Sequence, residues 1–162
     1  MRRRPPEVAA AGDAPVAGTK KGGIRITLFT VEEANQLLEW LRPTLEHLVG
    51  LKTEFDRAQR DVDVLALAAS GASPNNPDAQ ALDELQRRRV SLGEELGRGV
   101  QVIHRRGVLL KDLERGLVDF YTVSGDRLIF LCWQLSEPEV AHWHTLEGGF
   151  SGRLRLDRSE LE

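Results

Sequence analysis

Apolar side chains recur every three or four residues from Val31 to about Ala69, the spacing that places them along one face of an α-helix. Thr30 precedes this pattern and Glu33 follows three residues later, a pairing typical of a capping box at a helix start. Pro43 lies inside the pattern, and proline removes a backbone donor from a helix. The pattern therefore predicts either one kinked helix or a short helix followed by a longer one that starts near Pro43.

A second helical pattern follows the segment SGASPNNPDAQ, whose glycine, prolines and asparagines favour a turn. Apolar residues spaced by threes, fours and sevens predict a helix from about Asp78 to Ile103. Two long helices joined by a short loop form an antiparallel helical hairpin. Gly93, Gly97 and Gly99 either weaken the end of the second helix or allow it to approach the first closely.

From Gly107 the period changes from helical to alternating. The segment GLVDFYTVSGDRLIFLCWQL predicts two strands joined by a turn at Gly125, and VAHWHTL predicts a third strand. Alternation assigns one face of the first two strands to the core. Its residues are Val118, Phe120, Ile129, Leu131 and Trp133. The opposite face carries Asp119, Tyr121, Phe130, Cys132 and Gln134.

Together these patterns predict an α+β domain in which a long antiparallel helical hairpin packs on a small, about three-stranded antiparallel sheet from about Leu117 to Leu146. A chain of 162 residues suffices for one domain with its own core. We expect this domain at 24–156, followed by a tail at 157–162. Residues 1–23 combine five basic and two acidic side chains with many Ala, Pro and Gly, which predicts a disordered basic leader.

Charge and cysteine content narrow the class of protein. The net charge is −3, so the body is acidic once the basic leader is set apart. An acidic body argues against a dedicated nucleic-acid surface, although the leader could make weak contacts with phosphates. No apolar run approaches the ~20 residues of a membrane helix, and a single cysteine fits a reducing compartment. We therefore expect a cytoplasmic protein with no membrane partner.

The segment LCWQLSEPEVAHWHTLEGGFSGR concentrates the residues with chemical potential. If the tryptophan of the third strand points into the core, His142 and His144 share a face with Cys132 and Asp119. Imidazole, thiolate and carboxylate are common metal ligands, so these four residues are a candidate site for zinc or iron. Glu137 could then act as a base on a metal-bound water. The alternative is that the histidines and tryptophan simply pack at a sheet edge.

The length of the helical hairpin leads to the principal functional hypothesis. Helices of ~40 Å, at 1.5 Å per residue, exceed what three strands can cover, so apolar positions near the loop are expected to stay exposed in a monomer. We therefore expect a homodimer formed through the helices and a non-enzymatic interaction role. A divalent-metal protein, which could be hydrolytic, is the alternative.

The chain resembles the DUF2203 family of uncharacterised bacterial and archaeal proteins in four segments: FTVEEANQLLEWLRP, GLVDF, LCW and EPEVAHWHTLEGGFSGR. The positions that match the family's motifs are Asp119, Phe120, Cys132, Trp133, Glu137, Trp143, His144, Gly149 and Phe150. Two positions depart from the pattern: Ser136 stands where a glycine is usual, and His142 where an aromatic or aliphatic residue is common. The resemblance therefore favours His144 over His142 as a ligand. It implies domain boundaries but no activity, because none is established for the family.

Overall fold

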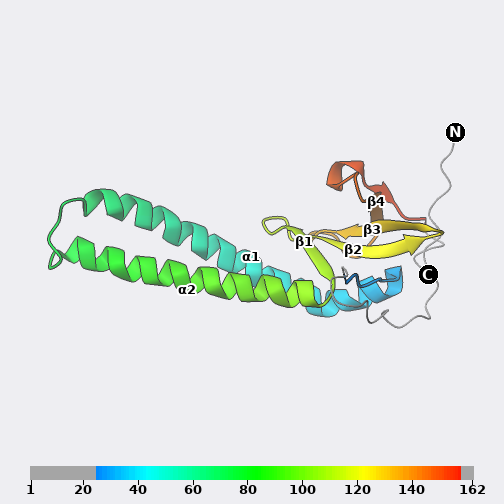
Figure 1. Cartoon of the computed structure of the whole chain (residues 1–162), viewed down its shortest axis with the longest axis horizontal. Helices are drawn as coiled ribbons and strands as arrows, with labels where there is room; N and C mark the ends of the chain where they lie inside the picture. Colours follow the sequence, from blue (N-terminus) through cyan, green and yellow to red (C-terminus); the bar gives the residue numbers. More distant parts are fainter. Residues whose placement is uncertain (1–24, 158–162) are drawn as a thin grey trace.

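A computed structural model describes residues 25–157 and shows an α+β fold: a long helical hairpin beside an antiparallel sheet (Figure 1). The leader expected at 1–23 and most of the expected tail lie outside the described residues. The elements are α1 (Val31–Ala68), α2 (Pro77–Arg105), β1 (Val108–Asp112), β2 (Leu117–Ser124), β3 (Arg127–Trp133), β4 (His142–Thr145), the 3₁₀ turn η1 (Phe150–Gly152) and β5 (Leu154–Arg155).

α1 begins after the predicted cap Thr30, and α2 begins at Pro77, one residue before the expected start, after a cap at Asn76. The Glu33 backbone N–H donates to Thr30 Oγ1 at 3.0 Å, and the Asp78 N–H donates to Asn76 Oδ1 at 2.8 Å. These bonds satisfy donors that would otherwise lack a partner at the helix start. α1 runs through Pro43 as one helix, so of the two alternatives a single helix is observed and a short helix followed by a longer one is wrong. Leu38 and Leu41 before Pro43 and Leu45 and Leu48 after it are all buried in one core cluster, and this packing outweighs the loss of one hydrogen bond.

Two of the three glycines in α2 allow close contact between the helices. A Cβ atom at Gly99 would collide with the Leu48 side chain of α1, and one at Gly93 would lie 3.3 Å from the Phe55 ring. A Cβ atom would therefore force the Leu48 side chain to move at Gly99 and would require a small shift of the Phe55 ring at Gly93. The expected cost of glycine inside the helix is therefore offset by packing at Gly93 and Gly99, whereas a Cβ atom at Gly97 would meet no neighbour.

The sheet has five strands in the order β1-β2-β3-β4-β5, each antiparallel to the next, and not about three. β1 was missed because VLLKD is an apolar run without alternation, and it follows directly on the end of α2. The chain turns back between α2 and β1 at Gly107, whose φ of 85° is costly for any other residue. β5 was missed because it has only two residues and both side chains are exposed.

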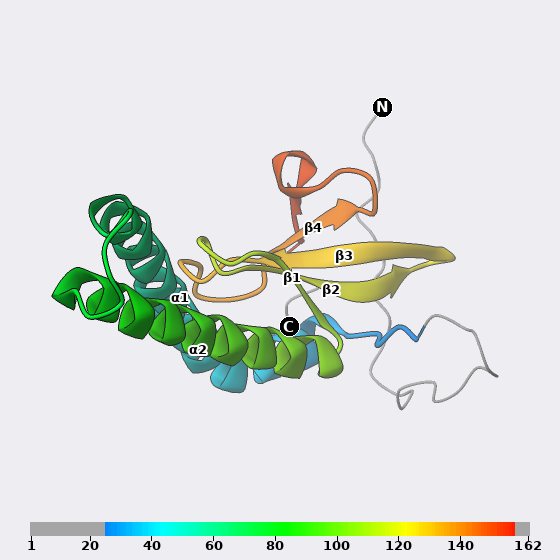
Figure 2. The same cartoon turned by 60° about the vertical axis from the view of Figure 1, so that its left-hand side comes forward.

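The two faces of the sheet have different roles. Val118, Phe120, Leu131 and Trp133 are fully buried on the face that packs on the helices, as strand alternation predicts. Figure 2 shows the helices on this side, with β4 and the segment that follows it rising on the other. The opposite face carries Asp119, Cys132 and the β4 histidines, so the polar cluster is separated from the helical hairpin by the sheet.

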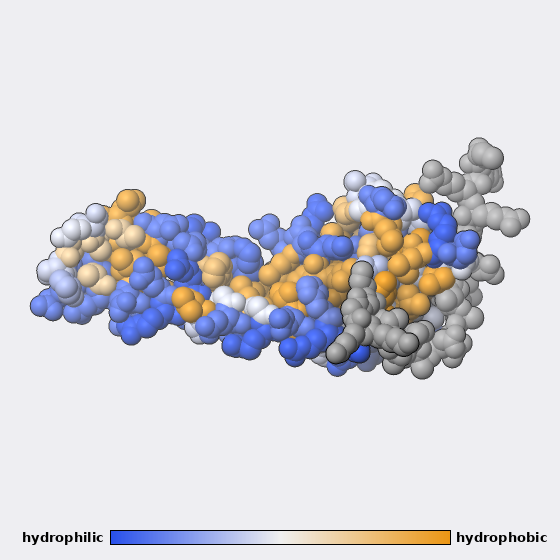
Figure 3. All heavy atoms as spheres, in the orientation of Figure 1, coloured by the Kyte–Doolittle hydropathy of each residue, from blue (hydrophilic) through white to orange (hydrophobic). Residues whose placement is uncertain are grey.

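The hairpin extends far beyond the sheet (Figure 1). We call residues 63–91 the distal arm; the structure describes every one of them, and none is buried. Val64, Leu67 and Val90 are 69%, 82% and 52% exposed, as expected for apolar positions near the loop. Figure 3 shows apolar atoms at the surface near the end of the arm, surrounded by hydrophilic ones. Within residues 25–157 no helix is both long and apolar enough to cross a bilayer.

Candidate functional site

Three neighbouring strands bring the polar cluster together. In the ladder between β2 and β3, Asp119 lies opposite Cys132, and in the next ladder Cys132 lies opposite His142. His144 lies two residues further along β4, opposite Phe130. Because side chains alternate along a strand, all four candidate ligands project from the face that is turned away from the helices. Their common face is therefore confirmed.

Asp119, Cys132 and His144 form a compact buried group. The nearest atoms are Asp119 Oδ1 and His144 Nε2, 3.0 Å apart, and the Nδ1 atom of His144 lies 2.7 Å from the Thr145 carbonyl oxygen. One carboxylate oxygen, the sulfur and one ring nitrogen all lie within 4.8 Å of one another. Each of the three residues is at most 3% exposed. Such a group can hold a divalent cation or serve as a buried polar network that ties three strands together.

An arginine that the sequence did not single out lies against this group. The Arg153 guanidinium makes two bonds to the Glu137 carboxylate, of 2.8 and 3.0 Å, and its Nη1 atom is 4.0 Å from the Cys132 sulfur. It also lies over the Phe150 ring, 4.5 Å from the ring centre. A bidentate ion pair with one face against an aromatic ring fixes the guanidinium plane.

Glu137 is fully engaged in this arrangement. Besides Arg153 it accepts a hydrogen bond of 3.0 Å from the Gln134 backbone N–H. Its backbone carbonyl accepts a bond from the Trp133 indole. A general base needs a lone pair directed at the proton that it removes. Glu137 therefore has a structural role: it positions Arg153 and the turn after β3.

The structure places His142 apart from the compact group. Its Nδ1 atom lies 3.1 Å from Glu137 Oε2 but out of line for a hydrogen bond. Burial and the nearby Arg153 cation lower the pKa of His142, and the Glu137 carboxylate partly opposes them. The structure thus brings three of the four candidate ligands together and sets the fourth beside the Arg153–Glu137 pair.

The Cys132 thiol is held in its neutral form. Burial, and next the adjacent Asp119 carboxylate, raise the pKa of Cys132 from an ordinary value of 9.0 to about 12. A thiol nucleophile requires a lowered pKa. A cysteine nucleophile is therefore disfavoured in the metal-free protein.

The raised thiol pKa predicts a measurable loss of stability at alkaline pH. Since the folded pKa exceeds the unfolded one, the stabilisation is complete below pH 9 and is lost as the pH rises from 9 towards 12. Between pH 8 and 10 the metal-free wild type should lose about 1 kcal/mol more unfolding free energy than Cys132→Ala. Urea titrations with a chelator at both pH values measure this. Equal losses in the two proteins would contradict the assignment.

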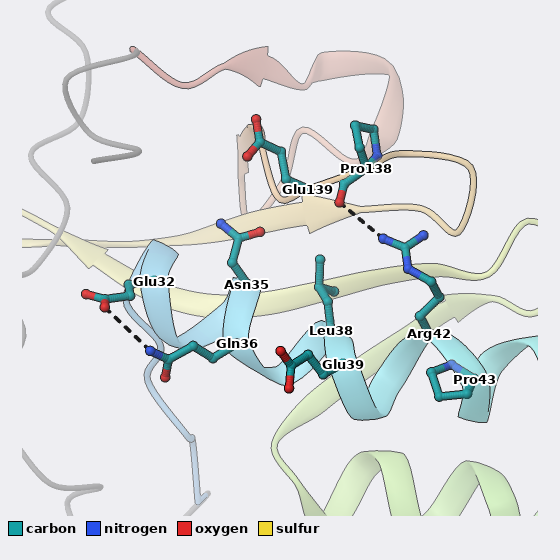
Figure 4. A pocket seen from close by; sticks show the side chains of 9 residues that line it. All are labelled: Glu32, Asn35, Gln36, Leu38, Glu39, Arg42, Pro43, Pro138 and Glu139. Carbon is teal, nitrogen blue, oxygen red and sulfur yellow. Dashed lines mark hydrogen bonds between the residues drawn. The ribbon is translucent and has the colours of Figure 1, made fainter.

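A groove of about 690 Å³ lies between the start of α1 and the turn after β3 (Figure 4). Two of its polar side chains, Arg42 and Asn35, have partners within the chain. The Arg42 guanidinium donates to the carbonyls of Leu135, Glu137 and Pro138, and Asn35 Oδ1 accepts from the Val140 backbone N–H. The groove therefore serves to fasten the turn to α1, and we do not assign it a ligand.

Comparison with known proteins identifies the family of the chain. Residues 27–156 match a family described as "Uncharacterized conserved protein (DUF2203)". The chain belongs to the DUF2203 family. The match confirms the resemblance seen in the sequence. No curated protein and no solved structure matches the chain, so the DUF2203 assignment carries no activity or ligand with it.

Arg153 is the site residue that sequence reasoning missed in this DUF2203 protein. It closes the segment GGFSGR, but its position beside Cys132 depends on the turns between β4 and β5. The pairing of His142 with Arg155 and of Trp143 with Leu154 brings that segment back along β4. The sequence shows only an arginine at the end of a glycine-rich segment, which is typical of any exposed loop.

Proposed function

We propose that the protein is a non-enzymatic homodimeric interaction module whose dimer interface is the distal arm. One observation carries this proposal: the 29 consecutive residues 63–91 of the helical hairpin contain no buried side chain. α1 has 38 residues and is therefore ~57 Å long, whereas the eight residues of β2 span ~26 Å. The sheet leaves the arm uncovered.

An isolated arm of this kind has little to stabilise it. Ordering each backbone residue costs about 1–2 kcal/mol, and short isolated helices are marginal in water. Within the arm Leu65, Leu82 and Leu85 are only half-buried. A second layer of helices would bury them further, together with exposed Val64 and Leu67.

The charge pattern favours a second copy of the chain as the partner. Residues 61–86 contain five acidic residues and no basic one. Five arginines border this acidic region on the side towards the sheet: Arg57, Arg60, Arg87, Arg88 and Arg89. In an antiparallel two-fold pair of arms, the acidic tip of each lies beside the arginines of the other. The surface is complementary to itself, which favours a homodimer.

Light scattering of the full chain at about 10 µM should give the mass of a dimer, and Leu67→Glu should give a monomer. Leu67 is 82% exposed, so the substitution leaves the fold of each chain intact, which circular dichroism verifies. Leu146→Glu is the matched control: Leu146 is 42% exposed but lies after β4, and its variant should remain a dimer. A monomeric wild type at this concentration would overturn the proposal.

Charge reversal distinguishes a self-complementary interface from general apolar association. Arg57→Glu with Arg60→Glu should weaken the dimer, and so should Asp78→Arg with Glu84→Arg. Combining all four should restore it in part, because the reversed charges again face each other. No restoration, together with no dependence on ionic strength, would exclude the antiparallel arrangement.

A further inference from the structure

We propose that Asp119, Cys132 and His144 form a binding site for a divalent cation of the zinc class. The proposal is independent of the dimer, because the three residues lie on the sheet face that is turned away from the helices. It rests on the directions in which the two ring nitrogens of His144 point, on the chemistry of the three donor atoms, and on their charge.

Each nitrogen of the His144 ring lies close to an oxygen atom of another residue. Nδ1 is 2.7 Å from the Thr145 carbonyl and Nε2 is 3.0 Å from Asp119 Oδ1. A neutral imidazole has one N–H, which the carbonyl takes because it can only accept. Nε2 then directs a lone pair at a carboxylate oxygen. Two acceptors so close in the interior require a cation between them, either a proton or a metal ion.

The surroundings fit a metal ion in that place. Histidine ligands usually donate their second ring N–H to a carbonyl or carboxylate, which is what Nδ1 does here. Two donors bonded at 2.0–2.1 Å to a tetrahedral ion are about 3.3 Å apart, close to the observed 3.0 Å between Nε2 and Oδ1. The Cys132 sulfur completes a group in which all donor atoms lie within 4.8 Å of one another.

Charge and donor type indicate which cation fits. A carboxylate and a thiolate together carry two negative charges, so a divalent ion leaves the buried site neutral. Arg153 and Glu137, which lie against it, neutralise each other. Binding releases to solvent the thiol proton and the proton shared by His144 and Asp119. Nitrogen, sulfur and oxygen donors select zinc-class ions over magnesium or calcium.

The position of the site in the fold points to a structural use. Its donors come from β2, β3 and β4, so one ion would connect three adjacent strands. All three residues are buried, and Glu137 is held by Arg153 and Gln134. Three protein donors leave the fourth position of a tetrahedral ion to a water molecule or another small ligand. Because Glu137 is already bonded to Arg153 and Gln134, it is not free to take a proton from such a water, and the ion would serve to stabilise the sheet.

Cobalt titration of the full, chelator-treated chain tests the site. Co²⁺ should bind one per chain, with visible bands of a tetrahedral ion and a near-ultraviolet charge-transfer band that requires a thiolate ligand. Zn²⁺ should displace it and raise the melting temperature. A wild type without the charge-transfer band at one equivalent overturns the proposal, whether or not any variant folds.

Matched variants assign the donors. His144→Gln and Cys132→Ser should each weaken Zn²⁺ binding about 100-fold or more, and Cys132→Ser should lose the charge-transfer band. His142→Gln is the control on the same strand, because His142 faces Glu137, and its affinity should stay within about threefold of the wild type. A band that persists in Cys132→Ser, or equal losses in His142→Gln and His144→Gln, would overturn the three-donor assignment.

Discussion

Replacement of Trp133 by alanine should lower the unfolding free energy by about 3–5 kcal/mol, the range for removing a large buried aromatic side chain. Trp133 is fully buried on the core face of β3 and donates its indole N–H to the Glu137 carbonyl at 3.1 Å. The Arg42 guanidinium lies over the ring, 5.1 Å from its centre. The substitution thus leaves a cavity and also removes a contact that positions the turn carrying Glu137.

Trp143→Ala is the natural control for this experiment. Trp143 lies on the same core face of the sheet, in β4, but is only partly buried. Its replacement should cost clearly less, because less apolar area is lost and part of the space is open to water. Urea denaturation followed by far-ultraviolet circular dichroism measures both. A Trp133→Ala loss no larger than that of Trp143→Ala would mean that the core is not centred on β3.

The second large effect concerns the buried Asp119–His144 pair. Removing either residue leaves the other in the interior without its partner. Breaking a buried pair in this way lowers the unfolding free energy by about 3–5 kcal/mol. Both side chains are at most 4% exposed. In metal-free protein, Asp119→Ala and His144→Ala should each be strongly destabilising. The double variant should cost about 1–3 kcal/mol less than the sum of the two, because neither group is then left unpaired.

The exposed pair of Asp83 and Arg87 provides the matched control. Its atoms are 3.3 Å apart on the surface of α2, and both side chains are about 70% exposed. An exposed pair one helical turn apart should show a coupling of about 0.5 kcal/mol or less in the same cycle. If the two cycles gave the same coupling, the Asp119–His144 contact would be no stronger than a surface ion pair.

The sequence predicts the parts of the fold that have a clear period. Apolar spacing located α1 to within one residue of its observed end, and it located α2 to within two residues at its end. Strand alternation placed Asp119 and Cys132 on one face and Trp133 on the other. It also placed His142 and His144 on the face of Asp119, on the condition that Trp143 points into the core.

The parts that escaped prediction have no period of their own. β1 is defined by pairing with β2 across the turn at Gly116, and β5 by pairing with two residues of β4. The contact of Arg153 with Cys132 spans 21 residues and several turns. Such features depend on tertiary contacts, which override local pattern. The alternation could align the donors of the site but could not show that His142 would face Glu137.

The meander order of the strands allows the helical hairpin to change in length while the sheet stays the same. Each strand pairs with the next one in sequence, and the loop between α1 and α2 lies at the far end of the arm. No strand has to thread past the hairpin. Seven residues added to each helix would lengthen the arm by about 10 Å and return its apolar stripe to nearly the same orientation. The arm is therefore a spacer whose length can vary in paired steps of two turns, while the strands that carry the polar cluster keep their register.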